Sequence, residues 1–380
     1  MKIAIDARFL GPEGTGIGKY TEKLLDNLVF LDHKNEYFVI LRKENWNLFN
    51  PDVDNFKKIL VNARYYGVKE QLLMPAALQK IKPDLAHFPH FNIPLLYPGK
   101  FVVTIHDIIK SEFKGASSTT RAAPIYYLKH FGYEFTIRQA VRRAKRILIP
   151  SVFTKKKLSK AFEIPASKVS VTYEAADEVF SVAGKQKVSE GKVNQVLSKY
   201  GVHKPFVIYV GAAFPYKNLD TLLSALSILP KKIRLVYASS RNTFVERLID
   251  KAREIGVSDR LITAGFVPNE DLAILYKQAE CLVFPSLSEG FGLPGLEAMA
   301  SGCPVVCSDI PVFKEVYGEA AVYFDPKKAK DIAEKIQFIV HNSEVKNQLI
   351  KEGFEQVKKY SWRKMAEETL KIYQDAGSKA

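Results

Sequence analysis

The feature that most constrains the fold is an alternation of short apolar runs with longer amphipathic stretches, which occurs in both halves of the 380-residue chain. In the first half, apolar runs at 37–42, 101–107 and 146–151 are typical of buried strands, and 21–31 has the spacing of an amphipathic helix. Parallel strands need long crossover connections, which are usually helices. The order of elements therefore predicts a parallel sheet covered by helices on both faces.

The same rhythm restarts after a polar stretch. Residues 182–203 include VAGKQKVSEGKVNQ, a run rich in Lys and Gly, which we interpret as a linker plus a helix. Further buried strands are predicted beyond it, at 205–211, 233–240, 260–267, 281–286 and 304–309. The sequence thus predicts an α/β protein of two doubly wound, Rossmann-like domains, 1–181 and 204–360, facing a cleft. Ligands in this fold class bind at the carboxyl ends of the strands.

The composition is that of a globular chain, with 47% hydrophobic and 26% charged residues and no apolar run of about 18 residues that could span a membrane. The first residues, MKIAIDARFL, carry too many charges for a signal peptide and are expected to form a strand. The three cysteines, Cys281, Cys303 and Cys307, cannot form a disulfide framework, and no other ligand completes a metal site around them. We therefore expect a cytoplasmic protein.

The net charge of +15 favours an anionic partner: a nucleic acid, an acidic membrane or a phosphorylated small molecule. Much of this charge lies between Arg121 and Lys160, where eleven Lys or Arg residues accompany one acid, Glu134, with aromatic residues interleaved. A basic amphipathic helix with aromatics suits an anionic membrane surface, but a solvated face above a core-facing aromatic stripe explains the pattern equally well. No nucleic-acid-binding signature is present, so none is expected as partner.

The stretch SEGFGLPGLEA places Glu289 and Glu297 on either side of a glycine-rich turn that leads from a predicted strand into a helix. Glycine lets a backbone approach a ligand closely, and the start of a helix offers N–H groups and a positive dipole end to a diphosphate. The carboxylates could accept hydrogen bonds from sugar hydroxyls. The alternative is an ordinary strand–turn–helix connection with a capping glutamate.

This stretch resembles the E-x7-E motif of the retaining glycosyltransferases of family 4, which adopt the two-domain GT-B fold. The resemblance implies that Glu289 faces the donor sugar and that Glu297 binds the ribose hydroxyls. It also implies that sugar and phosphate are held by the backbone amides of Gly290, Phe291, Gly292 and Leu293. Other parts of the family pattern are present along nearly the whole chain.

The stretch YVGAAFPYKNLDTLLSAL, which contains Gly211, resembles the first strand and loop of the family's C-terminal domain, where a lysine binds the donor diphosphate. That role falls on Lys217, which could neutralise the leaving phosphate as its charge develops; otherwise it is a solvated surface lysine. Many relatives carry an arginine just before this lysine or earlier in the loop, and this chain has Tyr216, Ala212 and Ala213 there. The diphosphate then has one cation fewer, or another residue supplies it.

Near the N-terminus, IDARFLGPEGTGIGKYTEKLL resembles the glycine-rich loop that follows the first strand in this family. Gly14, Gly16 and Gly18 are expected to present an open backbone to the cleft, with Gly16 as a donor-binding residue. The spacing lacks the third glycine of a dinucleotide site. Mannosyltransferases of bacterial surface-polysaccharide synthesis begin in a similar way, which favours mannose as the transferred sugar.

Three further segments fit the resemblance. His106, in FVVTIHDII, matches a family histidine beside the donor sugar, although a lone histidine at a strand end is otherwise more often structural. In GFVPNEDLAILY, the backbone around Phe266 and Val267 is expected to meet the nucleobase. His87 and His90, in HFPHFNIPLL, are expected to shape the acceptor site.

The last segment, 361–380, contains YSWRKMAEETLKIY and resembles the family's closing helix, which crosses back to the first domain; we expect Trp362 to serve packing there. Asp52 and Asp54 form a pair of the kind that holds a divalent metal in the other large fold class of glycosyltransferases. Here we interpret them as a turn, since Lys217 and a helix dipole could balance the diphosphate. No metal and no cofactor are expected.

Together these features predict a retaining glycosyltransferase. It would move a hexose, with mannose favoured, from a GDP- or UDP-linked sugar to a saccharide or lipid-linked hydroxyl. Binding of the 121–160 segment to anionic lipid would place it peripherally on the inner membrane face. Two alternatives stay open at this point: a sugar-nucleotide epimerase of the same fold, and a basic membrane- or nucleic-acid-binding protein without catalysis.

Overall fold

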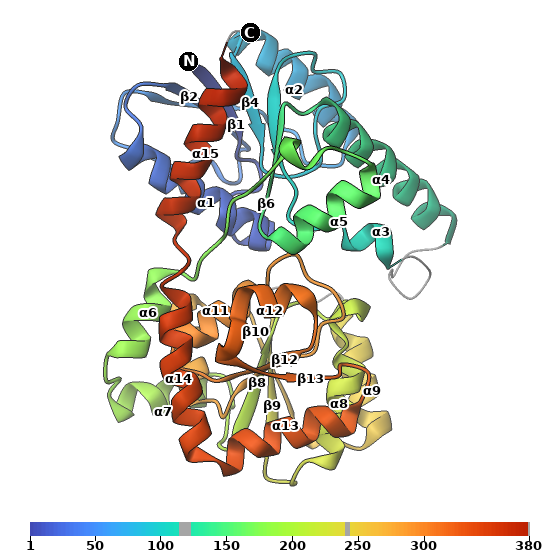
Figure 1. Ribbon diagram of the computed structural model, residues 1–380, viewed down its shortest axis with the longest axis vertical. Coiled ribbons are helices and arrows are strands. Elements are labelled where there is room, and N and C mark those ends of the chain that lie inside the picture. Colours follow the sequence, from blue (N-terminus) through green and yellow to red (C-terminus); the bar gives the residue numbers. More distant parts are fainter. Residues whose placement is uncertain (114–122, 240–243, 379–380) are drawn as a thin grey trace. The chain divides into compact units, whose positions relative to one another are not determined.

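The computed structural model describes residues 1–113, 123–239 and 244–378 (Figure 1), and these residues divide into two compact units. The first unit contains the described residues of 1–112, 121–174 and 361–380, and the second contains Phe113 and the described residues of 175–360. The C-terminal segment thus belongs to the same unit as the N-terminus. Each unit is built around its own parallel sheet.

The sheet of the first unit has strands in the order β3-β2-β1-β4-β5-β6-β7, all parallel. Their bounds are Lys2–Asp6 (β1), Glu36–Leu41 (β2), Phe56–Leu60 (β3), Leu85–Phe88 (β4), Phe101–Thr104 (β5), Arg146–Ile149 (β6) and Val169–Val171 (β7). The central strands β1, β4 and β5 are buried on both faces, apart from the first residue of β1. Continuous apolar runs of this kind are expected where helices cover both sides of a sheet.

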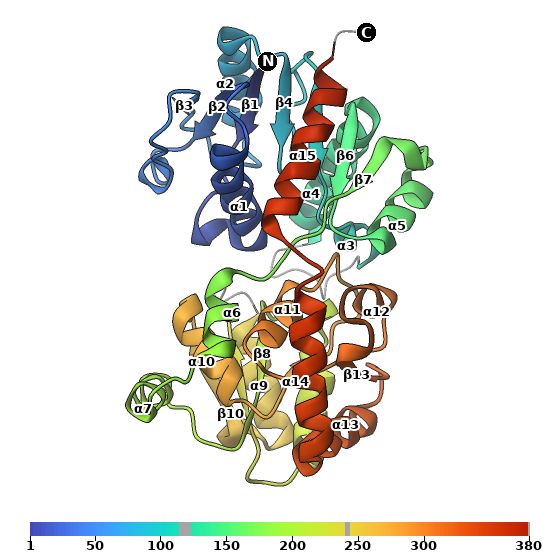
Figure 2. The same ribbon diagram turned by 60° about the vertical axis from the view of Figure 1, so that its left-hand side comes forward.

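The helices of the first unit cover both faces of its sheet (Figure 2). They are α1 (Thr15–Leu31), α2 (Val68–Ile81), α3 (Ile109–Glu112), α4 (Ala123–Arg143), α5 (Val152–Phe162) and α15 (Trp362–Gly377). Apolar side chains of α2, α4 and α5 join one core with alternate residues of the strands. On the other side, α15 packs against α1 and the strands β4, β5 and β6, and Trp362 at its start is buried.

The second unit contains a parallel sheet with the strand order β10-β9-β8-β11-β12-β13. The strands are Phe206–Val210 (β8), Arg234–Ala238 (β9), Leu261–Gly265 (β10), Leu282–Phe284 (β11), Val305–Ser308 (β12) and Ala321–Phe324 (β13). The prediction of two doubly wound α/β domains is confirmed. The strands β3, β7 and β13 were not predicted; each lies at an edge of its sheet, where fewer apolar positions are needed.

The helices of the second unit form two groups, as expected for a sheet covered on both faces. Their bounds are Glu178–Lys185 (α6), Glu190–Lys199 (α7), Leu219–Ile228 (α8), Val245–Ile255 (α9), Asn269–Gln278 (α10), Leu293–Ala300 (α11), Pro311–Tyr317 (α12), Ala329–His341 (α13) and Ser343–Val357 (α14). In one group α8 contacts α9 and α13, and the other contains α6, α7, α10, α11 and α14. The short helix α12 belongs to neither, since it contacts the turn Gly318–Ala320.

The division between the units falls after Glu174, ahead of the predicted boundary at 181. The stretch 182–203, expected to be a linker plus a helix, holds the end of α6 and the whole of α7, and both helices contact α10. The ammonium group of Lys277, on α10, donates to the carbonyl oxygens of Ala183, Gly184 and Gln186. These bonds and the apolar contacts of α6 attach the stretch to the second unit.

Candidate active site

Two charged candidate residues of the second unit lie on loops that leave two neighbouring strands in opposite directions. After β8 the chain proceeds to β9 on one side of the sheet, and after β11 to β12 on the other. Loops that diverge in this way leave room between them at the carboxyl ends of the strands, where ligands of doubly wound folds bind. Lys217 follows β8, and the turn with Glu289 follows β11.

Lys217 and Glu289 form an ion pair, with 2.5 Å between the ammonium Nζ and the carboxylate Oε1. Their side chains are 14% and 10% exposed, so the pair is within reach of solvent but mostly covered. The hydroxyl of Ser286 donates to the same carboxylate oxygen over 2.7 Å. The sequence predicted both charged residues but not that they bind each other.

Aromatic rings surround the ammonium group of Lys217. Its Nζ lies 5.3 Å from the ring centroid of Tyr216 and 5.5 Å from that of Phe284, and the Tyr216 ring stacks on Phe214. Such contacts attract a cation to the face of a ring. Tyr216 therefore helps to position the Lys217 ammonium, and the ring supplies no second cation beside it.

The turn before α11 requires glycine at Gly292. Its φ is +106°, and a Cβ added there would lie 2.3 Å from the hydroxyl oxygen of Tyr317. The Tyr317 hydroxyl donates to the Gly292 carbonyl over 2.5 Å, and this hydrogen bond helps to fix the turn. Leu293 then begins α11, with Pro294 in its first turn, where proline costs no hydrogen bond. The positive end of this helix thus lies beside the Glu289 turn.

The residues between the two glutamates contribute mainly backbone. Gly290 is buried, and the ring of Phe291 is buried against Tyr360 with 5.7 Å between ring centroids. Glu297 lies inside α11 and is partly exposed. Burial, and secondarily the charge of Glu297, raise the pKa of the Tyr276 hydroxyl well above its usual value. The two glutamates therefore have different surroundings: Glu289 pairs with Lys217, and Glu297 lies near Tyr276.

Gly211, Phe266 and Val267 also lie at the carboxyl edge of this sheet. Gly211 directly follows β8 with a φ of +140°, a conformation that favours glycine. Phe266 follows β10 and is 60% exposed, whereas Val267 is buried. An aromatic side chain left open at a strand end is unusual for packing and is available to a planar ligand.

In the first unit, the structure separates the three glycines that the sequence grouped together. A Cβ at Gly14 would lie 1.8 Å from the carbonyl oxygen of Phe9, and one at Gly18 would lie 2.4 Å from that of Gly11. These two glycines are needed for close packing. Gly16 is exposed and has no atom within 4 Å of a Cβ, so it alone of the three presents open backbone.

His106 follows β5, and each of its ring nitrogens faces a hydrogen-bond acceptor. Nδ1 lies 2.9 Å from the Glu174 carboxylate and Nε2 lies 3.1 Å from the carbonyl oxygen of Pro89. Burial alone would lower the pKa of His106, but the hydrogen bond and charge of Glu174 outweigh it and raise that pKa. An imidazolium satisfies both acceptors, since it donates from both nitrogens.

Glu174 was not predicted as a site residue. It lies 68 positions from His106 and carries no local motif, so only the packed fold brings the two together. The expectation for His87 is wrong: it is fully buried inside β4 and bonds to Tyr373 and Thr104. Burial, helped by the charge of His106, lowers the pKa of His87 to about 3, so it is neutral and structural. His90, by contrast, is partly exposed.

The basic segment 121–160 contains α4, β6 and α5, with Arg121 and the side chain of Tyr126 outside the described residues. Tyr127, Phe131 and Phe135, one helical turn apart on α4, are exposed. Tyr133 instead packs against Phe91 in the core. Most of the described aromatic residues of α4 therefore face solvent and do not form a core-facing stripe.

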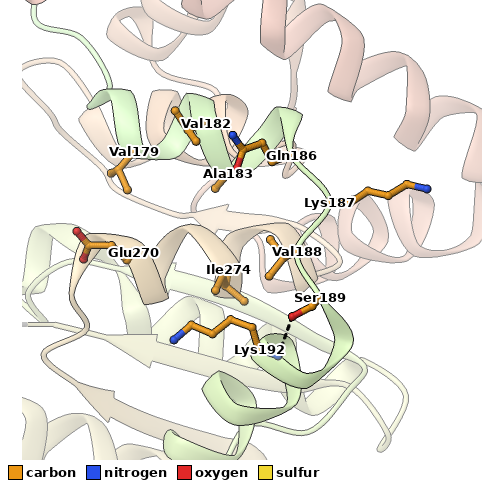
Figure 3. A pocket seen from close by; sticks show the side chains of 10 residues that line it. All are labelled: Val179, Val182, Ala183, Gln186, Lys187, Val188, Ser189, Lys192, Glu270 and Ile274. Carbon is orange, nitrogen blue, oxygen red and sulfur yellow. Dashed lines mark hydrogen bonds between the residues drawn. The ribbon is translucent and has the colours of Figure 1, made fainter.

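The described residues contain neither a cluster of metal ligands nor a membrane-spanning helix, but some of them line a pocket. Among the residues that the structure describes, no three His, Cys, Asp or Glu side chains are arranged to hold a metal ion. No described helix combines the length and the apolar character needed to cross a membrane. A pocket of about 310 Å³ lies between α6, α7 and α10 (Figure 3), and Val179, Val182, Val188 and Ile274 line it. Its lining comes from helices and their connection.

Comparisons with known proteins identify the family of the chain. Residues 14–179 match the family model described as Glycosyltransferase Family 4, and residues 198–356 match that of Glycosyl transferases group 1. The two matches lie one after the other along the chain and contain all the predicted site residues. The chain is a glycosyltransferase. The resemblance inferred from the sequence is thereby confirmed at the level of the family.

Two curated relatives of this glycosyltransferase match it over most of their length. The O-antigen chain mannosyltransferase B of Escherichia coli is 28% identical over 94% of this chain and 96% of its own. The O-antigen chain mannosyltransferase RfbU of Salmonella typhimurium is 28% identical over 84% of this chain and 86% of its own.

The fold is shared with solved structures. Anabaena HepE, solved in complex with UDP-glucose, superposes with a TM-score of 0.75 and covers 99% of this chain and 100% of its own at 15% identity. This similarity shows the fold alone, and the glycosyltransferase has the two-domain GT-B architecture expected from the sequence. The family matches also decide against a protein without catalysis.

Proposed function

We propose that this glycosyltransferase moves a hexose, with mannose favoured, from a nucleotide diphosphate sugar to a hydroxyl of a saccharide or lipid-linked acceptor, and keeps the anomeric configuration. Mannose is favoured because the two relatives described above are named O-antigen mannosyltransferases. A nucleotide sugar donor is supported by the UDP-glucose complex of HepE. The donor base, GDP or UDP, is part of what the experiment below decides.

The observation that carries the proposal is the Lys217–Glu289 pair beside the glycine turn at the β8–β11 divergence. A diphosphate entering here is a stronger partner for the Lys217 ammonium than a single carboxylate, since it brings more negative charge. Its arrival releases Glu289 to accept a hydrogen bond from a sugar hydroxyl. The pair therefore keeps both groups positioned for the two ends of the sugar–phosphate bond.

The other residues of the second unit hold the rest of the donor. The backbone from Gly290 to Leu293 and the start of α11 bind the diphosphate and sugar, and Gly211 allows close approach from the β8 side. Glu297 accepts hydrogen bonds from the ribose hydroxyls. The backbone at Phe266 and Val267 contacts the base, and the exposed ring of Phe266 offers it a stacking surface.

In the reaction that we propose, the bond between the anomeric carbon and the diphosphate breaks on the same face on which the acceptor oxygen attacks. The acceptor hydroxyl loses its proton to the departing phosphate, whose negative charge Lys217 stabilises. From the family resemblance we also assign contacts with the transferred sugar to His106 and Gly16. Because one ammonium and a helix terminus neutralise the leaving group, the proposal includes no metal ion and no cofactor.

We also propose that the enzyme works on the cytoplasmic face of a membrane, where α4 binds anionic lipid. Phe131, which is 70% exposed, lies between Tyr127 and Phe135 on one face of the helix, with the exposed cations Lys129 and Arg138 nearby. Exposed aromatics flanked by cations favour the interface of an acidic bilayer. Flotation with phosphatidylglycerol vesicles tests this: binding should need the acidic lipid and weaken in Phe131→Ser, and failure to float with any vesicle would contradict it.

The donor proposal is tested by thermal unfolding of the purified chain with GDP-mannose, UDP-glucose and the free diphosphates GDP and UDP. A ligand present at 100 times its Kd stabilises the folded state by about 2.7 kcal/mol. We expect one nucleotide series to raise the midpoint and the corresponding sugar to be transferred with retention, as read from the anomeric proton in NMR. If all four compounds leave the midpoint unchanged, or the product has inverted configuration, the proposal fails.

A further inference from the structure

A group of aromatic side chains lies at the carboxyl edge of the first sheet and is not explained by the donor site. Phe9, Tyr65, Tyr66 and His90 form what we call the aromatic platform. Phe9 stacks on Tyr65 with 4.1 Å between ring centroids, and lies 5.0 Å from His90 and 6.4 Å from Tyr66. Phe9 follows β1, the two tyrosines follow β3, and His90 follows β4.

The position of the platform is that of a ligand site. β1 and β4 are neighbours, and the chain leaves them toward opposite sides of the sheet, β1 toward β2 and β4 toward β5. This is the arrangement that opens a crevice at the strand ends in doubly wound folds. Phe9 is buried beneath the group, while Tyr65 and His90 are partly exposed and Tyr66 is 54% exposed. The rings therefore present an accessible apolar surface over a buried base.

Tyr66 is held in a backbone conformation that bulky residues avoid. Its φ is +64°, in the left-handed region, which costs about 1–3 kcal/mol for a residue with a large side chain. A buried carboxylate stabilises this conformation, because the Tyr66 N–H donates to Oε2 of Glu70 over 2.8 Å. Strain of this kind persists only where surrounding structure maintains it, and here it orients an exposed ring.

A buried polar network fixes the loops that carry the platform. Glu70 and Arg8 are fully buried and form an ion pair, and Asn92 donates to both oxygens of the Glu70 carboxylate over 2.8 Å. The backbone N–H of Asn92 donates in turn to Nδ1 of His90. One carboxylate thus positions both the Tyr66 loop and the His90 loop, so the rings keep their arrangement before any ligand arrives.

Hydrogen-bonding groups border the rings. The Tyr66 hydroxyl lies 3.2 Å from Nε2 of His90, and the guanidinium carbon of Arg42 lies 5.4 Å from the centre of the Tyr65 ring. Arg42 also pairs with the exposed carboxylate of Glu13, 3.2 Å away. A sugar ring has one face of C–H groups and a rim of hydroxyls. Aromatic faces can pack against the C–H groups, and the imidazole, phenol and carboxylate groups can form hydrogen bonds with the hydroxyls.

We infer that the aromatic platform binds a sugar ring of the acceptor, with its C–H face against Tyr65 and Tyr66 and its hydroxyls toward His90 and Glu13. This inference rests on the proposed function, since it assumes that the acceptor contains a saccharide. It assigns to the first unit a saccharide subsite whose residues do not include His106 or Gly16. A nucleobase on the same rings is the alternative that the experiment separates.

The test uses saturation-transfer NMR on the full chain with methyl α-D-mannopyranoside and N-acetyl-D-glucosamine as probes. We expect the wild type to transfer saturation to the C–H protons of at least one probe. Tyr66→Ala and Tyr65→Ala should reduce the signal at least fivefold, whereas Tyr66→Phe, which keeps the ring, should retain more than half. The control is Phe30→Ala, because Phe30 is an exposed aromatic residue near the end of α1, away from the strand ends.

The same variants are compared by thermal unfolding with GDP and UDP. Since those ligands belong to the second unit, their stabilising effect should be equal in wild type and Tyr66→Ala. Loss of the nucleotide shift only in the Tyr66 variant would assign the rings to a base instead. Equal saturation transfer in wild type and Tyr66→Ala, or none to either probe in the wild type, would overturn the inference, while the nucleotide shift would report separately on the proposed function.

Discussion

The two units use charged residues in opposite ways at the carboxyl ends of their sheets. In the second unit, Lys217 and Glu289 pair with each other where a ligand can still reach them. In the first unit, Arg8 is fully buried between Asp6 and Glu70, with 2.7 Å and 2.5 Å between the charged atoms, and no ligand can replace it. The pair of the second unit is therefore suited to exchange partners during a reaction. The buried ion pairs of the first unit are suited to fix the loops that carry them.

The largest effect should follow from Arg8→Met, which leaves two buried carboxylates without their cation. Breaking a buried ion pair by removing one partner costs about 3–5 kcal/mol of stability. Burial already raises the pKa of Glu70, and the charge of Arg8 opposes that rise. Without Arg8 the carboxylate takes up a proton more readily, so the loss should be larger at pH 8 than at pH 5.

Urea unfolding followed by circular dichroism measures this loss. Arg138→Met is the matched control, because Arg138 is 65% exposed and 4.0 Å from its acidic partner Glu134. Exposed pairs contribute at most about 1 kcal/mol. Equal stability of the two variants would show that the buried network does not support the first unit.

Lys217→Ala should leave the fold intact and lower turnover by a factor of about 10²–10³, the usual effect of removing one group that stabilises charge in the transition state. Glu289 keeps its hydrogen bond from Ser286 and some access to water, so little stability should be lost. Transfer assays with the donor identified by thermal unfolding measure the effect.

Lys199→Ala serves as the comparison, since Lys199 also pairs with an acid of the second unit, Asp271, but is 55% exposed and lies on α7. Its turnover should equal that of the wild type. If Lys217→Ala transfers sugar at the wild-type rate, the second unit's pair is structural, like that of the first.

Glu174→Gln should remove the partner that raises the pKa of His106. The pKa of His106 is higher in the folded protein than its unfolded value of 6.5, so protonation of His106 stabilises the fold. This stabilisation is complete below about pH 6.5 and is lost as the pH rises through the folded pKa. A hydrogen bond to a charged group contributes about 1.5–3 kcal/mol. The stability difference between wild type and Glu174→Gln should therefore shrink above pH 6.5. Unfolding curves measured from pH 5.5 to pH 9 would refute this if the difference stayed constant.

The smallest effects should distinguish two glycines, one from each unit. Gly292→Ala places a Cβ against Tyr317 at a φ of +106° and should cost about 1–3 kcal/mol through strain and overpacking. Gly16→Ala meets no atom and should leave stability unchanged or raise it by up to about 1 kcal/mol. Thermal unfolding measures both, and equal destabilisation would contradict the assignment of Gly16 as open backbone.

Much of the second unit's candidate site was predictable because it is local. Glu289, Gly292 and Glu297 fall within one strand–turn–helix segment, whose geometry depends mainly on neighbouring residues. The first unit was less predictable. Its three glycines look equivalent in the sequence, and only the carbonyl oxygens of Phe9 and Gly11 distinguish the packing glycines from Gly16. His87 was misassigned for the same reason, since burial and Tyr373 define its state.

By itself the sequence determined the fold class, the glycosyltransferase family and the residues of the turn after β11, because apolar periodicity and short motifs act over a few neighbouring residues. The tertiary structure decided which charges are paired. It joined Lys217 to Glu289 across 72 positions and His106 to Glu174 across 68, and it gathered Phe9, Tyr66 and His90 from three loops. Such contacts depend on the order of strands in a sheet, which brings distant segments to one edge. No single segment of the sequence determines that order.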